Sequence, residues 1–229
     1  MPISICENRN CMEAMREFPD KYFDLAVVDP PYGIDRDGGE TGKNWKRYEK
    51  KEWDSERPDM SYFKELFRVS KEQIIWGGNY FTEFLPPSMG WIFWDKGQDL
   101  TMSDGELAFS SYDKALRRLI LNRCKISEFG GNIHPTQKPV ALYKWLLTNY
   151  ARPGDKILDT HLGSGSSRIA AHDMGFDFWG YELDADYFAA MEKRFQAHIA
   201  KPVLFAPEQM YCFGKQSICA EARGERVLT

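Results

Sequence analysis

The sequence DPPY, which directly follows a short apolar run, combines an acid, two prolines and an aromatic ring. The run, residues 23–28, has the composition of a buried parallel strand, and proline cannot donate a hydrogen bond to a sheet. We therefore expect this sequence at the carboxyl end of a strand, where open α/β sheets bind their ligands. Its residues are Asp29, Pro30, Pro31 and Tyr32. A rigid set of acceptors beside an aromatic ring suits a flat, amino-bearing ligand, although a plain turn with a solvated acid fits four residues alone equally well.

A second pattern of acids and glycines lies in the stretch ILDTHLGSGSSR. A strand that ends at Asp159, a glycine-rich turn and a helix form the layout of a Rossmann-type cofactor site. Glu182 ends the next predicted strand and could accept hydrogen bonds from ribose hydroxyls. Arg168 stands where a dinucleotide-binding turn needs its third glycine, and no P-loop lysine follows. The pattern therefore favours a nucleoside without phosphates, such as S-adenosylmethionine, over a dinucleotide.

Strands and helices alternate along the chain, which predicts a mainly parallel, doubly wound α/β sheet. Strand patterns lie at residues 3–6, 23–28, 73–76, 90–96, 105–112, 115–122, 153–160 and 176–182. Helix patterns lie at residues 11–18, 60–69, 77–85, 134–150, 163–175 and 184–199, with Asp184 as the cap of the last one. The strands at 105–112 and 115–122 could pair as a hairpin.

The composition is that of a globular protein, since 43% of the 229 residues are hydrophobic. We expect a single catalytic domain at residues 1–200 and a C-terminal tail at 201–229. The five cysteines have no paired metal-type spacing, so we expect reduced thiols, no metal site and a cytoplasmic protein. Neither a signal-peptide pattern nor an apolar run of roughly 20 residues is present, so we expect no contact with a membrane.

Basic residues gather in two stretches, although the net charge of -4 does not by itself suggest a nucleic-acid-binding protein. The stretches lie within residues 35–58 and 97–130, the first interleaved with aromatic residues, a mixture that suits phosphates and bases. For either stretch alone, a solvated charged surface is the better interpretation. The candidate DNA-binding residues are Lys43, Lys46, Arg47, Arg117 and Arg118.

Four blocks of the chain resemble the amino-group DNA methyltransferases, which methylate the exocyclic amine of adenine or cytosine. The blocks are DPPYG, IIWGGNYF, HPTQKP and DTHLGSGSS, and together they frame residues 3 to 198. The resemblance implies a Rossmann-like S-adenosylmethionine-dependent methyltransferase fold. This fold has a seven-stranded mixed sheet, one antiparallel strand and helices on both faces. The catalytic block precedes the cofactor block, which is a circular permutation and resembles the family's beta group.

The resemblance also implies a chemistry for the DPPY block. The carboxylate of Asp29 and the carbonyl of Pro30 accept the two hydrogens of the target amine, which frees the lone pair of its nitrogen to attack the methyl group. Tyr32 stacks on a base that has been flipped out of the duplex. An aspartate at the first position favours adenine over cytosine.

The same resemblance implies a set of residues that bind S-adenosylmethionine. Thr160 and His161 replace the usual Pro-Phe of the family, and we expect His161 to pack over the cofactor as the phenylalanine would. Asn10 replaces the usual aspartate of an Asp-Cys pair, so it could accept a bond from the adenine amine, cap a helix, or do both. The complete set is Asn10, Cys11, Asp29, His134, Thr136, Lys138, Pro139, Asp159, His161, Leu162, Gly163, Ser164, Gly165, Ser166, Glu182 and Leu183.

The expected partner is double-stranded DNA, recognised through residues 35–58 and 97–130. These segments are short, which suggests a short site, relaxed specificity or a homodimer. Four alternatives stay open. They are a cytosine-amino methyltransferase, an enzyme that modifies RNA or a protein amide, a non-catalytic nucleic-acid-binding relative, and a dehydrogenase. Origin in a bacterium or phage, and pairing with a restriction enzyme, are family-level expectations.

Overall fold

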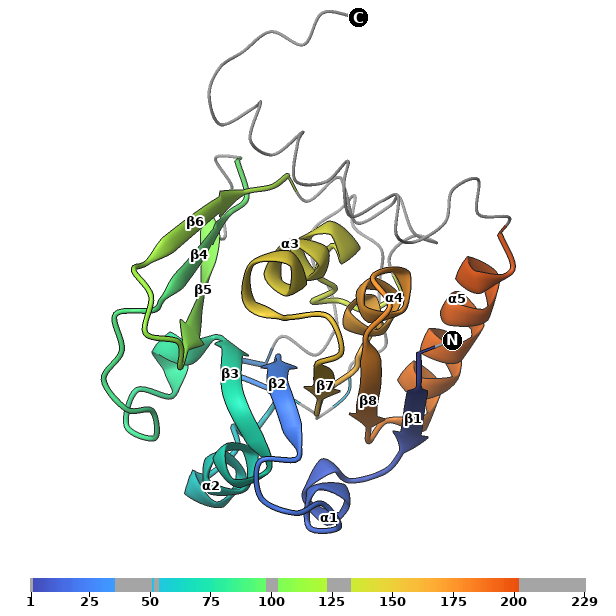
Figure 1. Cartoon of the computed structure of the whole chain (residues 1–229), viewed down its shortest axis with the longest axis horizontal. Helices are drawn as coiled ribbons and strands as arrows, with labels where there is room; N and C mark the ends of the chain where they lie inside the picture. Colours follow the sequence, from blue (N-terminus) through green and yellow to red (C-terminus); the bar gives the residue numbers. More distant parts are fainter. Residues whose placement is uncertain (1, 36–50, 52–53, 98–102, 123–132, 202–229) are drawn as a thin grey trace, which may run out of the picture.

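The computed structural model describes residues 2–35, 51, 54–97, 103–122 and 133–201. Within them, eight strands form one sheet in the order β1-β8-β7-β2-β3-β5-β4-β6 (Figure 1). Neighbouring strands pair in parallel except around β5, which runs antiparallel to both β3 and β4. The strands are β1 (Ser4–Asn8), β2 (Phe23–Val28), β3 (Ser70–Trp76), β4 (Ile92–Asp95), β5 (Gly105–Ser110), β6 (Arg117–Ile120), β7 (Lys156–Asp159) and β8 (Asp177–Glu182).

The mixed sheet with one antiparallel strand is confirmed, but the predicted number of seven strands is wrong. All eight segments with a strand pattern are strands of the sheet. The predicted hairpin of β5 and β6 is also wrong, because both strands pair with β4, one on each side of it. Between them the chain passes the first half of β3, where the backbone N–H of Ser111 donates to the carbonyl of Gln73 at 3.0 Å. It then passes helix α3 (Val140–Tyr150), where the hydroxyl of Tyr112 donates to the carbonyl of Tyr150 at 2.6 Å.

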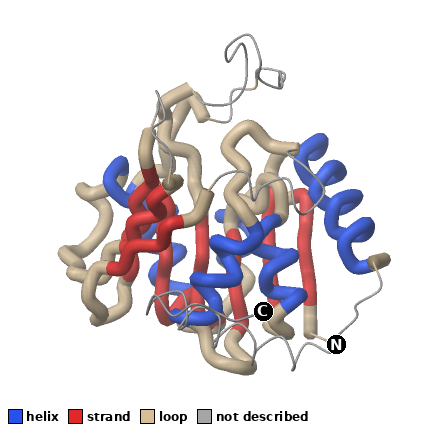
Figure 2. Tube along the Cα trace, turned by 90° about the horizontal axis from the view of Figure 1, so that it is seen from above, coloured by secondary structure: helices blue, strands red, loops and turns tan. Residues whose placement is uncertain are grey.

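Helices cover both faces of the sheet, as predicted (Figures 1 and 2). One face carries α1 (Cys11–Met15) and α2 (Met60–Val69), and the other carries α3, α4 (Ser166–Asp173) and α5 (Ala185–Ile199). A short 3-10 helix, η1 (Gly78–Tyr80), follows β3. Strand β2 shows why its sequence is continuously apolar. Alternate side chains enter the two cores, with Leu25 and Val27 facing α3 and Ala26 and Val28 facing the other layer.

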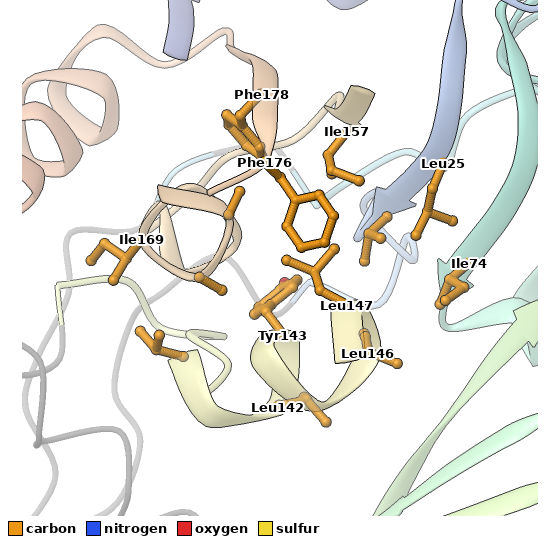
Figure 3. Packing of buried hydrophobic residues seen from close by; sticks show 14 of the residues in the cluster. Leu25, Ile74, Leu142, Tyr143, Leu146, Leu147, Ile157, Ile169, Phe176 and Phe178 are labelled. Atoms are coloured by element: carbon orange, nitrogen blue, oxygen red, sulfur yellow. The ribbon is translucent and has the colours of Figure 1, made fainter. Parts of the chain in front are cut away.

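Helix α3 is anchored through its apolar side. Figure 3 shows its Tyr143, Leu146 and Leu147 among side chains of β2, β3 and β7. Leu146 is completely buried and Leu147 is 3% exposed, and burying one such side chain contributes roughly 1.5–3 kcal/mol. This packing fixes the segment at residues 133–139, which leads into α3.

Caps and close contacts fix the turns at the carboxyl ends of the strands. The side chains of Asn10 and Asp184 cap α1 and α5, so the capping roles predicted for both are confirmed. Gly165 caps α4 with a φ of +70°, and a Cβ there would lie 2.4 Å from Cγ of Met191 in α5. The glycine-rich turn therefore needs glycine at this position both for its backbone and for helix packing.

Several predicted segments fall outside the described residues, among them 202–229, most of 35–58 and much of 97–130. In the described part of the chain, no helix has the length and apolar character needed to cross a membrane.

Candidate active site

A cavity of about 490 Å³ opens at the carboxyl ends of β1, β2, β7 and β8. This is the edge of the sheet where the sequence predicts ligand binding. The start of α2 and the segment before α3 complete its wall. Of the predicted site residues, those that line it are Asn10, Cys11, Asp29, Pro31, His134, Thr136, Lys138, His161, Leu162, Gly163, Ser164, Glu182 and Leu183.

The other predicted site residues lie behind this wall or beside it. They are Pro30, Tyr32, Pro139, Asp159, Gly165 and Ser166. Asp159 illustrates their position, because it is 2% exposed and its carboxylate accepts from the backbone N–H of His161 at 3.0 Å and from Oγ of Ser167 at 2.5 Å. Asp159 thus organises the glycine-rich turn from within. Burial, helped by the nearby carboxylates, raises its pKa to about 7.

Glu182 holds the glycine-rich turn against β8. Its two carboxylate oxygens accept backbone N–H groups, from Gly163 at 2.8 Å and from Asp184 at 2.9 Å. A carboxylate oxygen can accept two bonds, so Glu182 keeps acceptor positions for ligand hydroxyls. Burial raises its pKa. Four acids line the cavity and only two basic residues do, a balance that favours a positively charged ligand. The acids are Asp29, Asp59, Glu182 and Asp184, and the bases are Arg9 and Lys138.

Asp29 is held on both of its carboxylate oxygens. The hydroxyl of Tyr32 donates to Oδ1 at 2.6 Å, and Nζ of Lys138 donates to Oδ2 at 2.5 Å. The same ammonium lies 3.1 Å from Oε2 of Glu106. Burial raises the pKa of Asp29, although Lys138 opposes this effect. The DPPY and HPTQKP blocks are therefore joined by an ion pair.

The IIWGGNYF block makes room for the ring of Tyr32. A Cβ on Gly77, whose φ is +66°, would lie 2.1 Å from Cε1 of Tyr32. A Cβ on Gly78 would lie 2.8 Å from Cβ of Phe109, so both glycines permit close approaches. The ring of Tyr32 is stacked on that of Tyr80, with centroids 4.9 Å apart and planes 13° apart.

The two histidines of the cavity are neutral at physiological pH. Burial lowers the pKa of His134 to about 3 and that of His161 to about 4. Nδ1 of His134 lies 3.1 Å from Oγ1 of Thr136. His161 packs edge-on against Tyr62, with ring centroids 5.5 Å apart. Neither imidazole carries a charge that would repel a cation.

The start of α2 is the main part of the site that sequence reasoning missed. Asp59 caps this helix by accepting from the backbone N–H of Ser61 at 2.8 Å, and the hydroxyl of Tyr62 lies 2.7 Å from Oγ1 of Thr160. The capping pattern is visible in the sequence, but only the fold brings it to β7. The lining residues that were missed are Arg9, Met12, Pro58, Asp59, Ser61, Tyr62, Gln137, Tyr143, Thr160, Asp184 and Tyr187.

Two of the candidate DNA-binding residues are described by the structure, and neither lines this cavity. Arg117 and Arg118 are exposed on β6, the edge strand, and Nη1 of Arg118 lies 4.0 Å from Oδ2 of Asp95. Lys43, Lys46 and Arg47 lie outside the described residues.

The fold and the site define a Rossmann-like protein with a nucleoside-type cavity, and comparison with known proteins identifies the family. The model of the N6/N4 methylases, described as DNA methylases, matches residues 76–193. The chain therefore belongs to this family of DNA methyltransferases. The strand of the catalytic block precedes that of the cofactor block in the chain, but the circular permutation itself stays a prediction.

Two relatives and two solved structures illustrate the likeness. Type II methyltransferase M.HpaI of Haemophilus parainfluenzae is 24% identical over 235 residues, which cover 83% of this chain and 73% of the relative. M2.DpnII of Streptococcus pneumoniae is 34% identical over 73 residues, which cover 32% of this chain and 27% of the relative. The M1.HpyAVI–SAM complex has a TM-score of 0.58 at 19% identity, covering 84% of this chain and all of that one. The cytosine-N4-specific PvuII methyltransferase has a TM-score of 0.56 at 13% identity, and the match covers 91% of this chain and 90% of that one.

The buried imidazole of His161 should make stability depend on pH. Its pKa is about 4 in the folded protein and 6.5 ordinarily, so unfolding takes up a proton between these values. As the pH decreases through this window, this residue alone lowers the free energy of unfolding by about 1.4 kcal/mol per pH unit. His161→Phe removes the contribution. Urea denaturation between these pH values should show the free energy of unfolding of the variant rising relative to that of wild type as the pH decreases. A difference between the two that does not change with pH would contradict the assignment.

Proposed function

We propose that this protein transfers a methyl group from S-adenosylmethionine to the exocyclic amino group of adenine in double-stranded DNA. Membership of the DNA methylase family gives the reaction class, and the base and the residue roles are our proposal. The observation that carries the proposal is the location of Asp29. This carboxylate lines the same cavity as the glycine-rich turn and Glu182. An acceptor for the target amine is thereby next to the site proposed for the methyl donor.

The described residues fit the parts of S-adenosylmethionine. Glu182 has acceptor positions for the ribose hydroxyls, and Leu183, 70% exposed at the wall, offers an apolar surface for an adenine ring. The carboxylates of the cavity suit the positive charges of the sulfonium and amino groups. Asn10 can accept from the adenine amine in addition to capping α1. When bound, the donor supplies an electrophilic methyl group, and a solved neighbour of the same fold was crystallised with this compound.

The proposed chemistry depends on what Asp29 accepts. With the carbonyl of Pro30, its carboxylate accepts the two hydrogens of the target amine, which localises the lone pair on the nitrogen. Tyr32 now donates to Oδ1 at 2.6 Å, so the amine must displace that hydroxyl or use the second acceptor position. Methylation leaves an extra proton on the nitrogen. Asp29, whose pKa is raised by burial, is the nearest base suited to accept it.

DNA recognition is proposed for the segments at 35–58 and 97–130, and a homodimer is proposed as the source of further contacts. Lys51, within the first segment, forms ion pairs with Asp184 at 2.6 Å and Asp186 at 2.8 Å. These ion pairs hold Lys51 beside Asp184, which lines the cavity. Arg117 and Arg118 offer exposed positive charge on β6 for phosphates.

Methylation of the cytosine amine is the second candidate, because one of the neighbours in fold is a cytosine-N4-specific enzyme. The same acceptor geometry serves either amine.

A dehydrogenase is disfavoured, since Arg168 forms an ion pair with Glu192 and its guanidinium packs 3.8 Å from the ring centroid of Phe195, next to the glycine-rich turn.

The base is identified by labelling. The protein is incubated with tritiated methyl-S-adenosylmethionine and unmethylated genomic DNA, which is then digested to nucleosides. We expect label on the adenine amine. Asp29→Asn should lower the rate by about 100-fold or more while leaving binding of S-adenosylmethionine largely intact. Label on the cytosine amine would overturn the choice of base, and no label despite binding of the donor would overturn the function.

Gly77→Ala should separate catalysis from binding of the donor. The added Cβ would lie 2.1 Å from Cε1 of Tyr32 and displace its ring, whereas Gly77 does not line the cavity. We expect the methylation rate to fall with little change in donor affinity. Gly175→Ala is the matched control, because Gly175 has a φ of +77° and nothing within 4 Å of its added Cβ. Both variants carry about 1 kcal/mol of backbone strain. Equal loss of activity in the two would contradict a role for the Tyr32 ring.

A further inference from the structure

Four alternating charges form a connected row that leads away from the cavity. Nζ of Lys138 lies between Oδ2 of Asp29 at 2.5 Å and Oε2 of Glu106 at 3.1 Å. Nζ of Lys96 lies 3.0 Å from the other carboxylate oxygen of Glu106. Lys138 is 4% exposed and Lys96 is 7% exposed. The order of the row is Asp29, Lys138, Glu106 and Lys96, so its two positive and two negative charges sum to zero.

Such a row requires an explanation, because a buried ammonium costs several kcal/mol unless it is paired and hydrogen-bonded. Among the described residues that line the cavity, neither Glu106 nor Lys96 occurs, so no direct contact with a ligand accounts for them. Their connection to the site runs through Lys138, whose Nζ also lies 5.3 Å from the ring centroid of Trp76.

We propose that Glu106, itself held by Lys96, is a positioning residue of the methyl transfer, because it shares the ammonium of Lys138 with Asp29. Lys138 fixes the orientation of Asp29 and keeps it ionised, and the sharing with Glu106 leaves the oxygens of Asp29 good acceptors for the target amine. With Glu106 neutral, the ammonium would pair with Asp29 alone and compete with the amine for the same carboxylate. This inference rests on the proposed function of Asp29.

The electrostatic effect of Glu106 has a definite sign. Lys138 lowers the pKa of Asp29 and Glu106 raises it. Removing the charge of Glu106 should therefore lower the pKa of Asp29 and move the acidic limb of the rate profile to lower pH. The ionisable groups around Asp29 from the packed elements are Tyr32, Tyr62 of α2, Glu106 of β5, Lys138, Tyr143 of α3 and Asp159 of β7.

The experiment compares Glu106→Gln, Glu106→Asp and a control, Glu72→Gln. Glu72 on β3 also accepts a hydrogen bond, from Oγ of Ser111 at 2.5 Å, but it lies outside the row. The single-turnover rate of DNA methylation is measured against pH, and binding of S-adenosylmethionine is measured separately. For Glu106→Gln we expect a rate roughly 10- to 100-fold lower, the range typical of a residue that orients a functional group through a hydrogen bond, with unchanged donor affinity and a shifted acidic limb. Glu106→Asp keeps the charge and should restore the limb, and Glu72→Gln should behave as wild type.

Two outcomes would overturn the inference. One is a donor affinity that falls in Glu106→Gln as much as the rate does, and the other is an acidic limb that stays where it is in wild type. A readout without DNA separates this inference from the proposed function. The carboxyl carbon of Asp29 is titrated by NMR in isotopically labelled protein, with Asp29→Asn for its assignment. A lower pKa in Glu106→Gln would support the row even if wild type methylated no DNA, and an unchanged pKa would refute it.

Discussion

The burial of the Lys138 ammonium between two carboxylates is the constraint that ties the site together. It joins segments 109 positions apart in the chain, the end of β2 and the segment before α3. Neither carboxylate could be buried there alone without a large cost, and the lysine could not be buried without them. Every element that positions the three groups is therefore coupled to the others. The apolar side of α3 becomes part of the site in this sense, since its packing fixes where Lys138 lies.

The antiparallel strand explains how Glu106 reaches this position. Parallel strands meet the cavity where they end, and Asp29 follows the end of β2. Strand β5 runs the opposite way, so the residues at its start lie at the same edge of the sheet. Glu106 is the second residue of β5 and pairs in register with Trp94. Lys96, just past the end of β4, is held by its backbone N–H, which donates to Asp104 at 2.8 Å. One reversed strand thus supplies a carboxylate that a purely parallel sheet would place at the opposite edge.

The parts of the site that sequence reasoning found are those encoded locally. Asp29 and Glu182 each end or follow an apolar run, and the rule that ligands bind at the carboxyl ends of strands was enough to bring them together. Glu106 carries no such signal, because in GELAFS it resembles any polar residue of an alternating strand. Its role depends on which strand pairs with which, and the wrong expectation of a β5–β6 hairpin shows that pairing was not predictable here. The start of α2 was missed for the same reason.

The charges of the cavity also bear on turnover. In the proposed reaction a cationic sulfonium becomes a neutral thioether, and a proton leaves the methylated nitrogen. The wall carries more carboxylates than basic groups, and the charge of Lys138 is already matched by Asp29 and Glu106. The histidines add no positive charge, because burial keeps the pKa of both well below neutral. This negative field attracts the donor, and it attracts the product less strongly because the sulfur of the product carries no positive charge. The carboxylates that favour binding of the donor would therefore also favour its exchange after each methyl transfer.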